Sequence, residues 1–212
     1  MPNGDDNLLI KNCFLCQPDK DLIVWENEYL VAMVGLGPLT QKYFVVGTKD
    51  HIRSFSDAKA EENILLSLAK VRNILSGSDQ HMLMTENGRV PVCRTDGTNH
   101  EEHCFHAHVL LFDSPDIGSI ASSYFGEKRT FQSLHAAYGY SVALEPYHLV
   151  SSSPDDYTVF SQPLNVPRQL FRSLVAHLVG EEGSEDWQQH PQTLRAKKMA
   201  EKTRRRLGES DA

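Results

Sequence analysis

Short apolar runs separated by turn residues predict a small sheet in the first half of the chain. Short runs of β-branched and aromatic residues bounded by turn residues are typical of antiparallel strands. These runs occupy residues 22–25, 29–34, 43–46, 81–85 and 105–112. Residues 57–76 instead carry apolar side chains at helical spacing, which predicts one long amphipathic helix laid on the sheet. The pattern therefore favours an α+β fold with an antiparallel sheet.

Shorter elements are predicted after residue 113. A helix is predicted over 130–137 and a hairpin of two strands over 140–160. A further helix is predicted over 168–179, because a proline precedes it and a glycine follows it, as is typical of helix boundaries. The last predicted element is a basic helix over 195–206. These elements predict a helical C-terminal extension.

No repeat or low-complexity linker divides the chain into separate units. Its 212 residues with 40% apolar content are enough to bury one sizeable core. We expect a flexible arm at 1–12, a catalytic domain at 13–125 and an extension at 126–212 that packs on that domain.

The formal net charge of −7 argues against broad attraction to polyanions. Binding to extended nucleic acid or to an anionic membrane relies on a positive field over a whole face, so we expect neither. The N-terminus lacks the basic stretch and long apolar run of a signal peptide, and no run is long enough to cross a bilayer. We therefore expect a soluble, cytoplasmic protein.

Two histidines and a cysteine recur at a spacing of two around the start of the predicted strand at 105–112. Because side chains alternate between the faces of a strand, Cys104, His106 and His108 are predicted to lie on one side. A lone histidine in an apolar strand is usually a hydrogen-bonded core residue. The repeated spacing makes a chemical role an equal alternative.

A second group of candidate ligands consists of Cys13, Cys16 and His51. In a reducing compartment, the spacing of this cysteine pair favours metal or redox chemistry over a structural disulfide. Two thiolates and an imidazole suit tetrahedral zinc, and one ligand from the histidine strand would complete the set. The alternatives are two buried thiols that pack as small apolar groups, or a redox pair, which the absence of a βαβ context disfavours.

These motifs follow one another in an order that resembles the histidine-triad (HIT) superfamily. The similarity covers residues 13–113 and rests on Cys13-x-x-Cys16, Lys49-x-His51, Glu86-Asn87-Gly88 and Cys104-Phe-His-Ala-His108. Residues 166–172 and Trp187 are similar to the C-terminal extension of zinc-containing bacterial HIT-domain proteins. A more distant similarity is to the galactose-1-phosphate uridylyltransferases.

The resemblance implies a nucleotide hydrolase or nucleotidyltransferase, with hydrolysis favoured over transfer. The middle histidine of the triad would attack the phosphorus of a nucleotide phosphoester, phosphoanhydride or phosphoramidate and form a covalent nucleotidyl-histidine intermediate. A neutral imidazole is a competent nucleophile near neutral pH when its other nitrogen donates to a fixed acceptor. The resemblance also implies a HIT-like fold and a homodimer.

The same resemblance implies roles for particular residues. The structural zinc ion would be held by Cys13, Cys16, His51 and the first residue of the triad. The residues expected to contact the substrate are Asn87, Lys42, Arg94 and His103.

Only two of the three triad histidines are present, so the motif has two possible registers. In the register we favour, His106 is first and binds zinc, His108 attacks, and Leu110 takes the third place. In the other, Cys104 binds zinc, His106 attacks and His108 is third. We favour the first because His-Ala-His followed by an apolar strand, with a cysteine two residues ahead, is the arrangement of related bacterial members.

A further departure from the family pattern lies at Gly35, where the family usually has an aspartate that accepts hydrogen bonds from ribose hydroxyls. Hydrogen bonds to a carboxylate contribute about 1.5–3 kcal/mol each, so its absence weakens the case for an ordinary nucleotide substrate.

Two other functions stay open. One is a catalytically degenerate HIT-fold protein that binds a nucleotide or phosphoester and keeps structural zinc. The other is a structural zinc domain that presents its basic tail to a partner.

Overall fold

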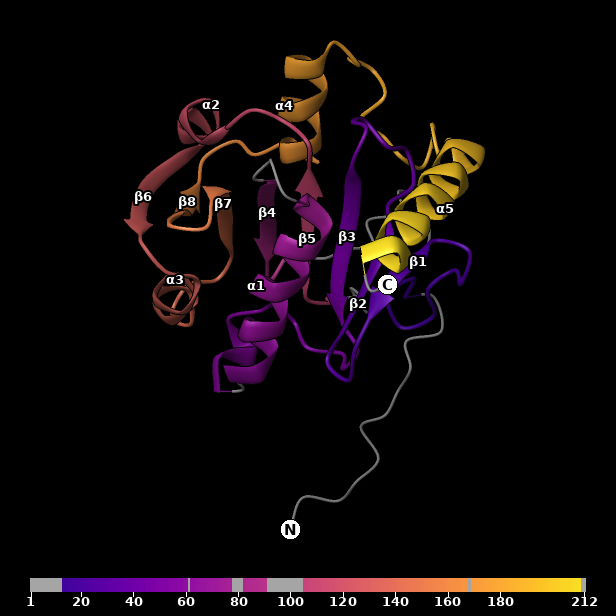
Figure 1. Cartoon of the computed structure of the whole chain (residues 1–212). Coiled ribbons are helices and arrows are strands. Elements are labelled where there is room, and N and C mark those ends of the chain that lie inside the picture. The colour runs from indigo at the N-terminus through magenta and orange to yellow at the C-terminus, as the bar shows by residue number, and fades with distance from the viewer. Residues whose placement is uncertain (1–12, 61, 78–81, 91–104, 168, 211–212) are drawn as a thin grey trace.

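One antiparallel sheet runs through the molecule and joins the two halves of the chain (Figure 1). The computed structural model describes residues 13–60, 62–77, 82–90, 105–167 and 169–210, and the statements below concern this part of the chain. The sheet has eight strands in the order β1-β2-β3-β5-β4-β7-β8-β6, with every neighbouring pair antiparallel. The predicted α+β class with an antiparallel sheet is confirmed.

The strands are β1 (Ile23–Glu26), β2 (Leu30–Val34), β3 (Tyr43–Thr48), β4 (Leu83–Gly88), β5 (His108–Phe112), β6 (Phe125–Phe131), β7 (Tyr147–Ser153) and β8 (Asp156–Pro163). The helices are α1 (Glu62–Ser76), α2 (Gly118–Ala121), α3 (Leu134–Ser141), α4 (Leu170–Val179) and α5 (Thr193–Ser210), with short 3-10 turns at Asp57–Ala60 and Ser122–Tyr124.

Helices α1 and α5 cover one face of the sheet, as Figure 1 shows. Helix α1 buries Ile64, Leu68 and Val71, which recur at helical spacing, while Glu62 and Lys70 are exposed. On the opposite face, residues 163–167 and 169–172 line a pocket together with Met33 of β2 and Val45 of β3. Strands β2 and β3 are buried along their whole length. This explains their continuous apolar sequences.

Two buried ionisable groups join α1 and the loops to the centre of the sheet. Arg72 of α1 donates to the Met82 carbonyl from Nη2 (2.7 Å) and to Ser151 Oγ from Nη1 (2.8 Å). Glu86 of β4 accepts hydrogen bonds from the Phe55 backbone N–H (2.9 Å) and the Tyr147 hydroxyl (2.8 Å). Burial raises the pKa of Glu86 to about 7. Both groups face away from the pocket described below.

The segment predicted as a helix over 130–137 is different in the structure. Strand β6 occupies its first part, and α3 begins only at Leu134, after Ser133 has capped it by accepting a hydrogen bond from Ala136 N–H (3.2 Å). Strand β6 lies at the edge of the sheet with exposed side chains over 127–130, so it lacks the apolar alternation by which strands are predicted.

The predicted hairpin over 140–160 is formed by β7 and β8, but it begins at Tyr147 because α3 continues to Ser141. These strands extend the sheet through the β4–β7 pairing, so the extension shares the core of the N-terminal half.

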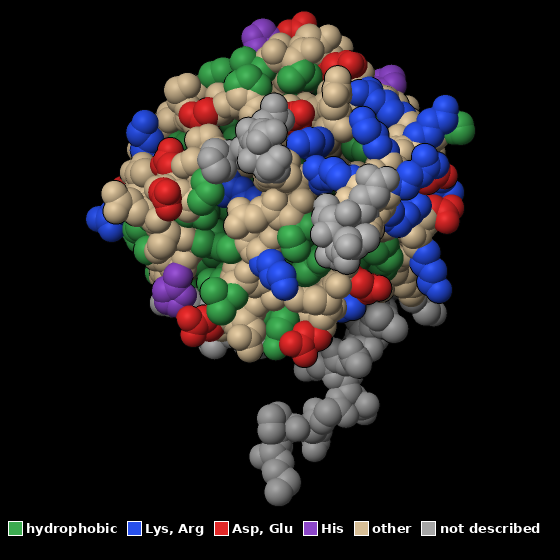
Figure 2. Space-filling view, viewed as in Figure 1, with side chains coloured by type: hydrophobic (Ala, Val, Ile, Leu, Met, Phe, Trp, Pro, Cys, Tyr) green, Lys and Arg blue, Asp and Glu red, His purple; other side chains and the backbone are tan. Residues whose placement is uncertain are grey.

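The two C-terminal helices were predicted close to their observed bounds. Helix α4 ends at Val179 and is capped by Gly180, whose φ of 74° is the left-handed conformation expected of a glycine C-cap. Helix α5 is basic, and Figure 2 shows Lys and Arg side chains gathered over it. No helix in the described ranges is both long and apolar enough to span a bilayer.

Candidate active site and metal centre

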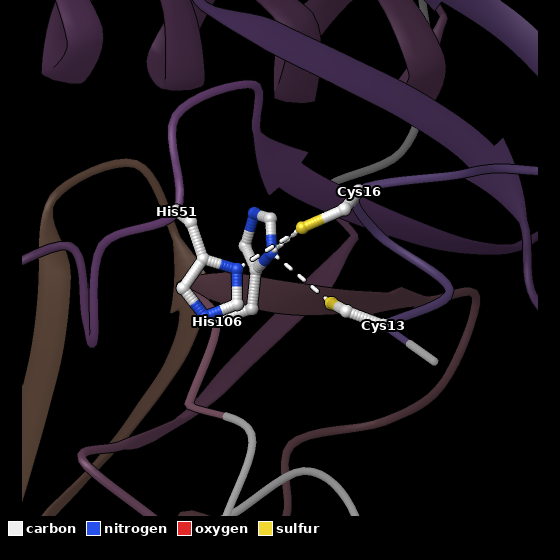
Figure 3. Close-up of side chains that lie close together, drawn as sticks. All are labelled: Cys13, Cys16, His51 and His106. Atoms are coloured by element: carbon white, nitrogen blue, oxygen red, sulfur yellow. Dashed lines mark hydrogen bonds between the residues drawn. The ribbon is translucent and has the colours of Figure 1, made fainter. Parts of the chain in front are cut away.

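Four side chains that are distant in sequence converge beside the end of β3. Their ligand atoms, from Cys13, Cys16, His51 and His106, all lie within 4.8 Å of one another. Figure 3 shows both thiols and both imidazoles pointing into the same space. The distances are 3.3 Å from Cys13 Sγ to His106 Nδ1 and 3.0 Å from Cys16 Sγ to His51 Nδ1.

These separations match those of ligands around one tetrahedral ion. Ideal zinc–sulfur and zinc–nitrogen bonds at a tetrahedral angle place sulfur and nitrogen roughly 3.5 Å apart. Cys16 Sγ and His106 Nδ1 are 3.5 Å apart as well. A set of two soft thiols and two imidazoles fits zinc chemically, so these four residues can hold a metal ion.

Hydrogen bonds orient the donors for this role. His106 Nε2 lies 2.7 Å from the Thr48 carbonyl, which can only accept, so Nε2 carries the proton and Nδ1 presents its lone pair to the thiols. Burial, followed by the hydrogen bond and charge of Cys13, raises the pKa of Cys16 to about 12. A metal ion that binds here would therefore displace protons from the thiols.

The turn at the start of the described chain brings both cysteines to the same side. The Cys13 carbonyl accepts hydrogen bonds from the backbone N–H groups of Cys16 (3.1 Å) and Gln17 (3.2 Å). Leu15 anchors the turn in the core, where a Cβ at Gly47 would lie only 2.9 Å from a Leu15 methyl carbon. A glycine at position 47 therefore allows the cysteine turn to pack against β3.

His108 has a different environment from His106, although only Ala107 separates them. Its Nδ1 lies 2.8 Å from the His106 carbonyl and must donate to it. Its Nε2 is therefore left without a proton, and the ring lines a large pocket on the sheet face opposite α1. Burial lowers the pKa of His108, which favours the neutral imidazole.

The prediction that Cys104, His106 and His108 share one side of a strand is not supported. Strand β5 begins at His108, so His106 precedes it and its ring turns to the cysteine pair. Cys104 lies outside the described residues. Within the described chain, it is His106 that joins Cys13, Cys16 and His51, as in the favoured register.

Asn87 and His148 continue a row across the sheet from His108. The register of β4 and β5 places Asn87 beside His108, and Asn87 is paired with His148 of β7. His148 Nδ1 donates to Asn87 Oδ1 (2.8 Å), and among the described residues no hydrogen bond from the Asn87 amide N–H groups is seen. Burial lowers the pKa of His148 to about 4, which keeps it neutral.

The pocket has a volume of about 630 Å³, and its walls are largely apolar. Met33, Val45 and Leu110 form part of the floor. Arg172 of α4 lies at the end remote from His108, with its guanidinium 5.1 Å from the centroid of the Tyr43 ring. The volume lies within the range of small-molecule binding sites.

Tyr43 accounts for the glycine at position 35. A Cβ at Gly35 would lie 2.2 Å from a carbon of the Tyr43 ring, so no side chain fits there while Tyr43 keeps its position. The pocket therefore has an aromatic ring and a nearby cation where the family pattern has a carboxylate.

The remaining predicted substrate contacts have different outcomes. Asn87 lines the pocket, whereas Lys42 does not: its Nζ donates to the Ser76 carbonyl (2.9 Å), and it lines a second pocket beside α5. The position of Lys42 gives no support to a substrate contact. Arg94 and His103 lie outside the described residues.

Sequence reasoning assigned no role to several polar residues of the pocket, among them His148, Gln169 and Arg172. His148 had a detectable signal, since it is a histidine within an apolar strand pattern. Gln169 and Arg172 both belong to the stretch that resembles the bacterial extension, but no role followed from that resemblance.

No protein-family model and no curated protein matches the chain. Among solved structures, a HIT family hydrolase from Clostridium thermocellum aligns with 19% identity and a TM-score of 0.37, over 51% of this chain and 95% of that chain. A hypothetical histidine triad nucleotide-binding protein from Sulfolobus tokodaii aligns with 23% identity and a TM-score of 0.33, over 47% of this chain and 67% of that chain. Neither is described as a galactose-1-phosphate uridylyltransferase, so that more distant similarity stays a prediction. The chain is thus similar in part to solved HIT proteins, and the function proposed below is derived from its own residues.

Proposed function

We propose that this chain is a HIT-type nucleotide hydrolase that acts through a covalent nucleotidyl intermediate on His108. The observation that carries the proposal is the hydrogen bond from His108 Nδ1 to the His106 carbonyl, which leaves Nε2 unprotonated at the pocket. A histidine that is neutral, oriented and open to a nucleotide-sized cavity has the properties of a nucleophile.

In the first step, the lone pair of His108 Nε2 attacks the α-phosphorus of a nucleotide phosphoester, phosphoanhydride or phosphoramidate. A P–N bond forms, and the bond to the leaving group breaks with its electron pair on the departing atom, which then takes a proton. The amide N–H groups of Asn87 lie beside His108 and can donate to the phosphoryl oxygens, because Asn87 Oδ1 is already engaged by His148.

In the second step, water attacks the same phosphorus and the P–N bond breaks. The electron pair returns to Nε2, and the water loses its proton as nucleoside monophosphate is released. His108 returns to its starting state. Another nucleophile in place of water would give transfer, and hydrolysis is the version that we propose.

Cys13, Cys16, His51 and His106 would hold a structural zinc ion close to this chemistry. When bound, the ion would supply rigidity, since it would fix the ring of the residue whose carbonyl orients His108. Loss of the metal is expected to affect both folding and the position of the nucleophile.

A second candidate function is a nucleotide- or phosphoester-binding protein without turnover. It is favoured by Leu110, which lines the pocket two residues after His108, where a third histidine would lie in the family motif. Such a protein would raise its melting temperature with ligand but release no product.

The test is to incubate the protein with nucleoside phosphoramidates and dinucleotides and to denature it rapidly at alkaline pH, where a P–N bond survives. Intact mass and peptide mapping should find one nucleoside monophosphate on His108, and none in His108→Ala. Turnover with an adduct on another residue would contradict the assignment, and ligand binding without adduct or turnover would favour the binding protein.

A further inference from the structure

A second pocket, of about 450 Å³, lies between α5 and the start of β3. It shares no lining residue with the pocket at His108. Phe44 of β3 lines the second pocket, whereas its neighbours Tyr43 and Val45 line the pocket of His108. Because successive side chains of a strand point to opposite faces, the two pockets lie on opposite faces of the sheet.

Positive charge is concentrated in this second pocket. Helix α5 carries seven Lys and Arg residues and only two Glu residues, a formal charge of +5 in a chain whose net charge is −7. Figure 2 shows these basic side chains gathered over α5. One carboxylate, that of Glu201, lines the pocket together with five cationic side chains. The five are Lys42, Lys198, Lys202, Arg205 and Arg206.

Two of these cations are held against the end of α1. Lys42 Nζ donates to the Ser76 carbonyl (2.9 Å), and Arg206 Nη2 donates to the Leu75 carbonyl (2.8 Å). Carbonyl groups at the C-terminus of a helix carry a partial negative charge, which favours cations there. A partial charge does not neutralise a full one, so the wall of the pocket that faces α1 stays positive.

The other three cations, Lys198, Lys202 and Arg205, are exposed and lie along one side of α5. Among the described residues they have no hydrogen-bond or ion-pair partner, Glu201 included. Like charges four residues apart on a helix repel each other, as in the case of Lys198 and Lys202, and a bound anion would relieve this repulsion. From position 198 to position 205 the helix rises by roughly 10 Å, which is longer than a single phosphate group.

We propose that this pocket binds a linear oligophosphate along α5. Lys198, Lys202 and Arg205 would contact successive phosphoryl groups, with Lys42 on the opposite wall. Hydrogen bonds between ionised partners are stronger than neutral ones, and a chain of phosphates matches a row of cations better than one phosphate does. The site is separate from His108 and does not depend on the proposed function. It gives a role to the basic tail and to Lys42, which the hydrolase mechanism does not use.

The test is calorimetric titration of the full chain with inorganic triphosphate, pyrophosphate and orthophosphate at one fixed ionic strength. Triphosphate should bind about tenfold or more tightly than orthophosphate, because it reaches more of the cations. Its affinity should fall as the salt concentration rises. No binding by triphosphate, or equal affinity for triphosphate and orthophosphate, would overturn the proposal.

Nucleoside triphosphates carry the same phosphate chain, so adenosine 5′-triphosphate is titrated as a separate arm. Tighter binding than inorganic triphosphate, lost in Lys202→Gln, would identify a nucleotide as the source of the chain. Weaker binding at this site would identify a free oligophosphate.

Variants locate the site on α5. Lys202→Gln removes an exposed cation and should weaken triphosphate binding by about fivefold or more, and the double variant Lys198→Gln/Lys202→Gln should abolish it. Lys70→Gln is the matched control, since Lys70 is an exposed lysine of α1 that lines neither pocket. It should change the affinity by less than about twofold, because a solvated charge outside the pocket is screened. An unchanged affinity in Lys202→Gln, or an equal loss in Lys70→Gln, would contradict the proposal.

Discussion

The metal centre and the remote end of the pocket satisfy their polar atoms in opposite ways. At the metal centre, His106 uses both ring nitrogens, one toward the cysteines and one toward the Thr48 carbonyl. At the remote end, Arg172 and Gln169 each keep one buried polar atom without a partner in the described chain. His108 lies between the two regions, with one nitrogen bound and the other presented to the pocket.

We infer from this difference that the two regions have different roles. Donors that already face one another at ligand spacing favour a site that holds the fold, whereas a large cavity beside an unprotonated ring nitrogen favours a site that binds a ligand. Changes at the metal centre should therefore reduce stability and activity together. Changes in the pocket should reduce binding or turnover and leave the fold intact.

The largest expected effect comes from His108→Ala. Removal of the proposed nucleophile should reduce turnover by about a thousandfold or more, measured as nucleoside monophosphate released. Metal content and melting temperature should stay close to those of the wild type, because His108 contributes no ligand atom to the cluster. His177→Ala is a suitable control, since this exposed histidine pairs only with Glu182 in the described chain. Substantial turnover in His108→Ala would contradict the assignment of His108 as the nucleophile.

The next largest effect is expected from Cys13→Ser, which should lose bound metal and several kcal/mol of unfolding free energy. Metal analysis and thermal unfolding with and without a chelator measure both quantities. Cys104→Ser provides the control, because the favoured register gives the fourth ligand to His106 and predicts that this variant keeps its metal. Loss of metal in Cys104→Ser would instead favour the shifted register.

Acidification should test how well the pocket excludes water around His148. Its pKa in the folded protein, about 4, lies below the ordinary value of 6.5, so the unfolded chain binds a proton first. Neutral, buried His148 therefore contributes fully to the free energy of unfolding above pH 6.5. This contribution is lost as the pH falls from 6.5 through 4, and the loss is about 3 kcal/mol at most. His148→Gln should flatten this part of the stability curve, measured by urea unfolding from pH 7 to 4. An unaltered curve would mean that His148 is well solvated.

The smallest of these effects is expected from Gly35→Asp, at about 2 kcal/mol of destabilisation through the clash with Tyr43. Adding Tyr43→Ala should recover part of that loss, because it removes the ring that fills the space. Gly208→Asp, where a Cβ meets nothing within 4 Å, is the control and should change stability little. An additive double variant would show that Tyr43 does not fill the Gly35 position.

The strands around the metal centre could be predicted because their apolar residues are contiguous. The long helix could be predicted because its apolar residues recur at helical spacing. Candidate ligands could be chosen from thiol and imidazole spacing, although only the fold shows that His106 meets Cys13. Strand β6 could not be predicted, since an exposed edge strand needs no apolar pattern. The contact between Tyr43 and Arg172 could not be predicted from the sequence either, because it depends on how α4 packs over the sheet.

The stereochemical course at phosphorus tests the central claim most directly. A substrate made chiral at the α-phosphorus with sulfur and hydrolysed in oxygen-18 water would undergo two in-line displacements if His108 forms a covalent intermediate. The account predicts net retention of configuration in the nucleoside phosphorothioate product. Net inversion would mean a single direct attack by water and would contradict the proposed role of His108.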